Sequence, residues 1–107
     1  MIEKLELCLD FNKKIDSGVV KLDLLNSAFS SYHYYRDSKH QICSVVKGII
    51  KNHPFRDGNK RTALFFLYVV AEEYRFRLIP DDIIDDKLVD IAANEYSVEE
   101  ISNMLFV

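Results

Sequence analysis

The sequence predicts an all-α protein, a compact bundle of about six helices around a buried central helix. Its 107 residues include only 3 Gly and 2 Pro, which leaves little turn chemistry for a fold of many short strands. Apolar side chains recur at helical spacing along most of the chain. The hydrophobic fraction of 49% and the charged fraction of 29% are ordinary for a globular protein, so we expect a single domain over residues 1–107.

Two helices are expected in the first third of the chain. Apolar residues recur at near-helical spacing over residues 2–15, and the Asp-Ser-Gly sequence at residues 16–18 breaks this pattern. A second, shorter helix covers residues 22–29. The stretch at residues 30–37 then loses the helical period, so we expect a functional loop or a small hairpin there.

The clearest helical pattern lies directly before His53. Pro54 disfavours the α conformation of the residue before it, so this third helix is expected to stop near Asn52. Residues 60–74 contain no helix breaker and are apolar on nearly every side, which predicts the central helix. The apolar stripe of the third helix consists of Ile42, Val45, Val46, Ile49 and Ile50.

Two further helices are predicted near the C-terminus. Pro80 marks a stop, and Asp81 and Asp82 suit the positive start of the next helix. Ser97 and Glu100 then form an S-x-x-E capping box for a last helix.

Charge and hydropathy argue against several classes of protein. The net charge of −3 gives no general footprint for nucleic acid. The longest apolar run, residues 63–71, is far shorter than the ~20 residues that span a bilayer, and the N-terminus lacks the basic start of a secretion signal. We therefore expect a cytoplasmic protein with no membrane partner. Cys8 and Cys43 belong to no close-spaced pair, so we expect buried free thiols.

The segment from His53 to Arg61 collects groups that suit a phosphate. The first N–H groups of a helix lack partners and its dipole is positive there, so a turn made by Gly58 and Asn59 would form an anion-binding nest. Lys60 and Arg61 add positive charge beside the same anion, and Arg61 can offer a planar fork to two phosphate oxygens.

Three other side chains of this segment have separate expected roles. A histidine accepts protons near neutral pH, so His53 is placed to take a proton from an attacking hydroxyl. Asp57 could hold Mg²⁺, which prefers one or two carboxylates together with substrate phosphates. Phe55 is expected to point the other way and to anchor the loop in the core. The alternative is a polar interhelical loop with His53 and Asp57 as helix caps, but nine adjacent residues with separable roles favour a phosphate site.

The segment His-Pro-Phe-Arg-Asp-Gly-Asn-Lys-Arg resembles the Fic motif, H-x-F-x-[D/E]-G-N-G-R-x-x-R, and is closer to its Doc (death-on-curing) branch, in which N-K-R-T-A-L follows. The resemblance implies the Fic/Doc helical fold and a transferase that uses ATP or another nucleoside triphosphate. It assigns the general base to His53, the core anchor to Phe55 and the Mg²⁺ ligand to Asp57. The phosphate-binding residues that it implies are Gly58, Asn59, Lys60 and Arg61.

Two departures from the Fic motif set the expected reaction. Lys60 stands where Fic enzymes that transfer AMP have Gly, and Leu64 stands where they have a second Arg. Doc toxins share both departures, and the resemblance implies that they bind the nucleotide reversed and phosphorylate a threonine of elongation factor Tu. We therefore expect a protein kinase, with Fic-type protein adenylyltransfer (AMPylation) as the alternative.

The resemblance also implies two protein partners. Residues 32–37 fall where Fic/Doc proteins carry a flap that pairs with an extended piece of the target, an arrangement that aromatic and polar residues suit. The chain lacks the inhibitory [S/T]-x-x-x-E-[G/N] helix of many Fic proteins, so we expect control by a small antitoxin, as in toxin–antitoxin pairs. The alternative is an ordinary exposed loop whose tyrosines pack on the bundle. The expected docking residues are Tyr32, His33, Tyr34, Tyr35 and Arg36.

Two functions of other classes compete with transfer. A catalytically silent binding module could keep the fold for recognition alone, but the intact His53 and Asp57 argue against it. A His/Asp metal hydrolase would need further ligands, and the sequence offers no second set at convincing spacing.

Overall fold

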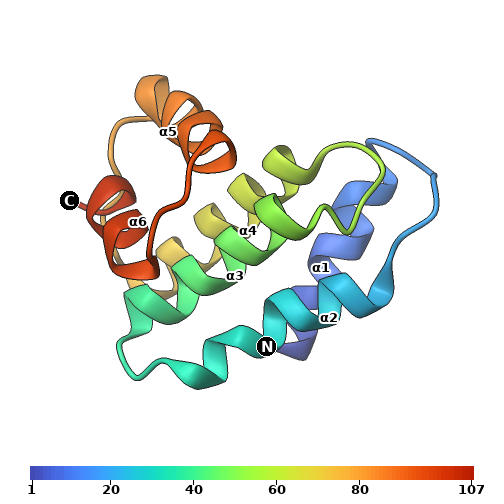
Figure 1. The fold of residues 1–107 in the computed structure, drawn as a ribbon, viewed down its shortest axis with the longest axis horizontal. Coiled ribbons are helices and arrows are strands. Elements are labelled where there is room, and N and C mark those ends of the chain that lie inside the picture. The colour runs from blue at the N-terminus through green and yellow to red at the C-terminus, as the bar shows by residue number, and fades with distance from the viewer.

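The computed structural model describes all residues 1–107 and confirms an all-helical protein. Six α-helices and one short 3₁₀ helix, η1, make up the fold, and no strand is present (Figure 1). The elements are α1 (Ile2–Lys13), α2 (Leu22–Ser30), η1 (Ser31–Tyr34), α3 (Ser38–Asn52), α4 (Asn59–Tyr74), α5 (Asp81–Ala93) and α6 (Val98–Leu105).

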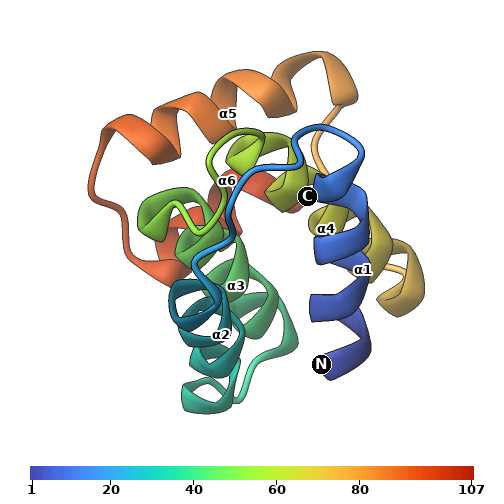
Figure 2. The ribbon, with the colours of Figure 1, turned by 90° about the vertical axis from the view of Figure 1, so that its right-hand side faces the viewer.

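Helix α3 holds the centre of the bundle. It contacts α2, η1, α4, α5 and α6, whereas α1 packs on α4 and α2 (Figures 1 and 2). The prediction placed residues 60–74 at the centre, but α4 keeps one side open to solvent, where Tyr68 is 37% exposed. Part of its apolar surface meets α1 instead, since the Phe65 ring stacks on Phe11 at 4.3 Å.

The core is one contiguous cluster of apolar side chains from all six α-helices and the Phe55 loop. Ile42, Val45, Val46 and Ile49 are fully buried, as the helical stripe predicted. Helices α2 and α3 approach closely where Gly48 faces Ala28. A Cβ atom at position 48 would lie 2.6 Å from the Ala28 Cβ and 2.7 Å from its Cα, so only glycine fits there.

The predicted helix ends are largely confirmed. Ser97 and Glu100 form the expected capping box at the start of α6, and α3 stops at Asn52 with His53 in the left-handed region. The Asp37 side chain caps α3 by accepting from the His40 N–H. At α5 the N-cap residue is Pro80, and the two aspartates occupy the first turn without capping.

The predicted hairpin within residues 30–37 is wrong. Residues Ser31–Tyr34 form η1 instead, where the Ser31 hydroxyl donates to the Ala28 carbonyl at 2.6 Å and its oxygen lies 3.0 Å from the Ser44 hydroxyl of α3. The structure's extended pairs are two isolated bridges, Val20 with Phe55 and Leu78 with Phe106.

Two further features are the state of the two cysteines and the length of the apolar helices. Cys8 and Cys43 are free and buried, and burial raises the pKa of each thiol to about 12, so both are unreactive. No helix combines the length and the apolar character that crossing a bilayer requires.

The close contact of α2 and α3 predicts the effect of Gly48→Ala. The new methyl group must push the helices apart, so we expect a loss of about 1–3 kcal/mol in the free energy of unfolding, although alanine is the better helix former. Urea unfolding of the wild type, Gly48→Ala, Ala28→Gly and the double variant measures this loss of stability. The double variant should recover part of the loss, and a stabilised Gly48→Ala would contradict the packing.

Candidate active site

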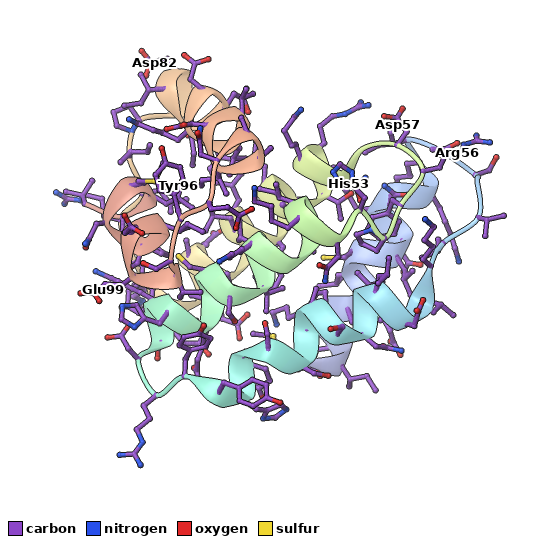
Figure 3. All side chains as sticks on the ribbon, viewed as in Figure 1. His53, Arg56, Asp57, Asp82, Tyr96 and Glu99 are labelled. Carbon is purple, nitrogen blue, oxygen red and sulfur yellow. The ribbon has the colours of Figure 1, made fainter.

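The loop at residues 53–58 connects the end of α3 to the start of α4 and carries the predicted catalytic groups (Figure 3). His53 has a positive φ of 50°, which turns the chain sharply out of α3 just before Pro54. Gly58 has φ 79°, and a Cβ there would approach Ile15 and Asn12 to 3.1–3.2 Å. Glycine is therefore required at this position for both its backbone and its space.

The Asn59 side chain closes this loop from the inside. Its Oδ1 accepts from the Phe55 N–H at 3.0 Å, and its Nδ2 donates to the Phe55 carbonyl at 2.8 Å. These two bonds fix which end of the amide is which. Nδ2 then also lies 3.3 Å from Nδ1 of His53. Because the Phe55 ring is 3% exposed and packs in the core, the loop is held at both its backbone and its side chain.

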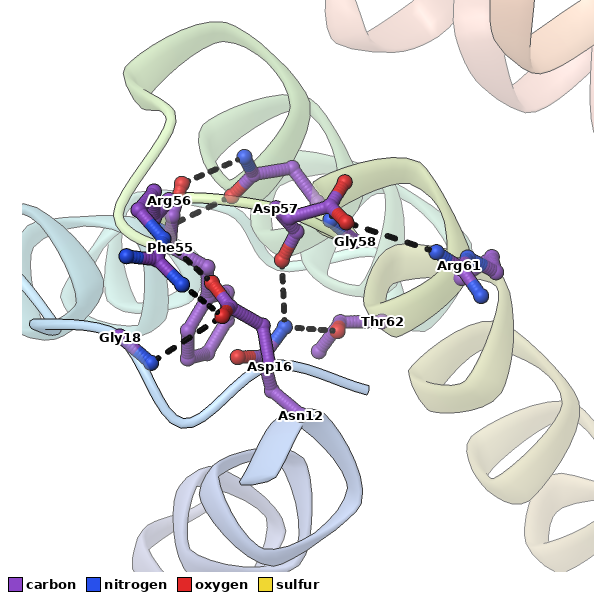
Figure 4. Close-up of polar contacts among 10 residues, drawn as sticks. Asn12, Asp16, Gly18, Phe55, Arg56, Asp57, Gly58, Arg61 and Thr62 are labelled. Atoms are coloured by element: carbon purple, nitrogen blue, oxygen red, sulfur yellow. Dashed lines mark hydrogen bonds and ion pairs between the residues drawn. The ribbon is translucent and has the colours of Figure 1, made fainter. Parts of the chain in front are cut away.

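Helix α1 supports the loop through Asn12, whose side chain is buried at 3% exposure. Its Nδ2 donates to the Asp57 carbonyl at 2.9 Å and to the Thr62 hydroxyl at 3.1 Å (Figure 4). One amide thus joins the loop and the first turn of α4 to the N-terminal helix.

A second clasp joins the loop to the segment between α1 and α2. The Arg56 guanidinium forms a two-pronged ion pair with Asp16, and the Gly18 N–H donates to the same carboxylate at 3.2 Å (Figure 4). The hydrogen bond from Arg56 lowers the pKa of Asp16 below its ordinary value of 3.8. Next to the clasp, the Lys21 N–H donates to the Pro54 carbonyl at 2.8 Å, which places residues 19–21 along the loop (Figure 2).

The loop encloses a depression of about 400 Å³ that contains no apolar residue. No side chain caps the N-terminus of α4, which leaves its first N–H groups without side-chain partners, and its first residues Asn59, Lys60 and Arg61 line the depression. Asp57 supplies the one carboxylate among the lining residues. Its Oδ1 accepts from the Gly58 N–H at 2.8 Å, and its Oδ2 lies 3.8 Å from a guanidinium nitrogen of Arg61. The residues that line the depression are His53, Arg56, Asp57, Gly58, Asn59, Lys60 and Arg61.

A second depression, of about 410 Å³, also adjoins His53. Val19 and Lys21 line it together with residues 53–56. His53 and Arg56 line both depressions, so both spaces adjoin these two residues. An anion on one side and a second molecule on the other could both reach His53.

The structure brings together all the predicted phosphate-site residues but not the predicted docking residues. Residues 32–36 precede α3 and His53 follows it, and a helix of 15 residues is about 22 Å long. Tyr32 lines a separate depression with Val70 and Tyr74, at the far end of α4 from Asn59. The segment that does adjoin the loop is residues 16–21.

Sequence reasoning missed Asn12 and Asp16, which fix the site from outside the motif. Asn12 contacts Asp57 and Thr62, and Asp16 contacts Arg56. Each contact joins residues 40 to 50 positions apart, so the helical spacing of side chains does not reveal it. A weak signal existed for Asn12, a polar residue next to the apolar Phe11 near the end of the first helix.

Comparison with protein families decides the assignment. The family model described as Fic/DOC family matches residues 4–71. The chain belongs to the Fic/DOC family. Its members are generally transferases that carry out AMPylation or phosphorylation. No curated protein and no solved structure matches the chain. The Fic/DOC match ends within α4, so α5 and α6 lie beyond it.

The Asp16–Arg56 pair predicts a pH-dependent stability difference. The pKa of the Asp16 carboxyl is lowered in the folded protein, so its ionised form stabilises the fold above pH 3.8. This contribution disappears as the pH falls through the lowered pKa. The unfolding temperature of Asp16→Asn should lie below that of the wild type by a constant gap above about pH 5, and the gap should close at lower pH. Asp10→Asn, on the exposed face of α1, is the matched control and should show no gap. A gap that persists at low pH would contradict the pairing.

The Asn59 closure predicts a large loss of stability in Asn59→Ala. Two buried backbone groups of Phe55 would lose their partners, so we expect the free energy of unfolding to fall by about 2–4 kcal/mol. Chemical denaturation of this variant and of Asn103→Ala, an exposed asparagine of α6, measures the effect. Equal stability of the two variants would show that the closure contributes little.

Proposed function

We propose that this protein is a Doc-type protein kinase, which transfers the terminal phosphoryl group of Mg-ATP to a threonine hydroxyl of a target protein. One observation carries the proposal: a depression without apolar residues joins an imidazole, a single carboxylate, three cationic side chains and a helix N-terminus without a side-chain cap. These are the groups that phosphoryl transfer needs, since it depends on positioning and on charge stabilisation at phosphorus.

The free N–H groups of α4 bind phosphate oxygens in this proposal. With Lys60 and Arg61 they offset the charge that develops when the bond from phosphorus to the bridging oxygen breaks and its electron pair leaves with ADP. The target hydroxyl approaches from the Val19 side of His53, in line with the leaving oxygen.

His53 takes the proton of the attacking hydroxyl. Because the Asn59 amide nitrogen faces Nδ1 as a donor, the neutral ring carries its lone pair on Nδ1 and its hydrogen on Nε2. The contact between Asn59 Nδ2 and His53 Nδ1 is long at 3.3 Å. We therefore assign Nδ1 as the nitrogen that gives up its hydrogen bond with Asn59 and accepts the proton of the target hydroxyl.

Asp57 is the residue that would hold Mg²⁺. No group of three or more His, Cys, Asp or Glu side chains is arranged for a metal, so the protein alone offers no metal cage. One exposed carboxylate beside an anion site fits a magnesium ion that arrives with the nucleotide phosphates. When bound, the ion neutralises charge on the phosphate oxygens.

Two residues favour phosphoryl transfer over AMP transfer. Lys60 lines the depression, at the position where the motif of AMP-transferring Fic enzymes has Gly. Leu64 packs partly buried against the core, so this position offers no second cation to the far end of a nucleotide. The expected target remains a translation factor similar to elongation factor Tu, and the expected regulator is a small antitoxin. Docking of the target at residues 32–36 stays a prediction, and we propose residues 16–21, which adjoin the loop, as a further contact for the target.

The proposal predicts a specific covalent product. Elongation factor Tu incubated with the protein, Mg²⁺ and ATP should gain the mass of one phosphate group in intact-protein mass spectrometry, and His53→Ala should reduce this rate by at least about 100-fold. The variant should unfold at the wild-type temperature, because His53 is exposed.

The same experiment identifies the other reactions. A gain of one AMP would mean that Lys60 and Leu64 do not set the orientation of the nucleotide. No modification of elongation factor Tu, or of any protein in a bacterial lysate treated in the same way, would contradict transfer and favour a silent binding module.

A further inference from the structure

Arg56 is the one lysine or arginine that lines both depressions beside His53. The others each line one of these two spaces: Lys60 and Arg61 the phosphate depression, and Lys21 the second depression. In the proposed function the phosphates occupy the first space and the target hydroxyl enters through the second. A phosphoryl group that passes from one to the other therefore moves past His53 and Arg56.

The Fic motif leaves the position of Arg56 open, as the x before its acidic residue. In this structure the side chain has a defined place. Its guanidinium pairs with Asp16 through Nε and Nη2 (Figure 4). The Asp16 side chain is 11% exposed and that of Arg56 is 69% exposed. The carboxylate is therefore the buried partner, and the guanidinium is the accessible one.

The pair with Asp16 uses one edge of the guanidinium and leaves another edge free. Arginine has five N–H donors, and Asp16 takes that of Nε and one of Nη2. Both N–H groups of Nη1 and the second of Nη2 remain, and this edge matches two oxygens of a phosphoryl group. Arg56 can therefore bind a phosphoryl group without leaving Asp16.

Gly18 makes room for this arrangement. A Cβ atom at position 18 would lie 2.7 Å from Nε and 2.8 Å from Cζ of Arg56, so a larger residue would displace the guanidinium. The Gly18 N–H also donates to Asp16 at 3.2 Å. The segment between α1 and α2 thus supplies both the carboxylate that fixes Arg56 and the space that the guanidinium occupies.

We propose that Arg56 binds the phosphoryl group during its transfer and stabilises the transition state. This inference rests on the proposed function, since it needs phosphoryl transfer beside His53. The hydroxyl oxygen bonds to phosphorus and gives its proton to His53, while the bond to the bridging oxygen breaks and its electron pair leaves with ADP. Negative charge then spreads over the three other oxygens of the transferred group, and the free edge of Arg56 donates to two of them.

Three variants separate this catalytic role from the structural role of the pair with Asp16. Arg56→Gln removes the guanidinium, whereas Asp16→Asn removes the charge of its partner and keeps the guanidinium. Arg77→Gln changes an exposed arginine beyond the far end of α4 and is the matched control. For each protein we would measure the rate of phosphate transfer to elongation factor Tu at saturating Mg-ATP, the KM for ATP and the unfolding temperature.

Arg56→Gln should reduce kcat by at least about 100-fold and change the KM for ATP by less than about threefold, because the contact forms mainly in the transition state. Asp16→Asn should lower the unfolding temperature as much as Arg56→Gln does. It should reduce kcat by no more than about tenfold, because the guanidinium remains. Arg77→Gln should match the wild type in all three measurements.

Equal losses of kcat in Arg56→Gln and Asp16→Asn would limit Arg56 to its structural role and overturn the inference. A change confined to the KM for ATP would overturn it as well. Either result leaves the proposed function standing. A wild-type protein that transfers no phosphate would overturn the proposed function, and this inference with it.

Discussion

The pair of hydrogen bonds between the Asn59 side chain and the Phe55 backbone is the contact on which the site depends. It holds the loop in a closed turn and orients the amide toward His53. Because Asn59 is also the first residue of α4, the same contact fixes where the helix begins. The free N–H groups, the cations and the imidazole therefore come to one depression through a single buried amide.

The loop is supported from the N-terminal part of the chain as well as by the core. Asn12 joins α1 to the loop and to α4, and Asp16 joins the following segment to Arg56. These contacts use side chains that carry no chemistry of their own. They hold the interhelical connection, and the side chains that it carries, in one arrangement. A loop that is held in this way before a ligand arrives lowers the cost of binding.

Local chemistry explains why much of the fold was predictable. The stripe of α3, the stop before Pro54 and the Ser97–Glu100 capping box all depend on residues within a turn or two of one another, and the structure has each of them. The hairpin at residues 30–37 was wrong because Ser31–Tyr34 form a 3₁₀ helix beside α3, and the contact of Ser31 with Ser44 depends on tertiary packing that local sequence does not show.

The candidate site likewise has residues that the sequence predicted and residues that it did not. The motif residues adjoin one another along the chain, so their grouping followed from sequence, and the Fic/DOC match agrees with it. The contributions of Asn12 and Asp16 depend on how the helices pack, and packing sets which distant segments meet. Residues 16–21 replace residues 32–36 beside the loop for this reason: α3 separates its two ends by its full length.

Amide chemical shifts of the protein during titration with Mg-ATP test the central claim most directly, that the loop and the start of α4 form a phosphate site. The account predicts that the largest shifts fall on the N–H groups of Gly58, Asn59, Lys60 and Arg61. Shifts confined to other parts of the chain, such as the polar groove that Ser31, Ser44 and Lys47 line, would contradict it.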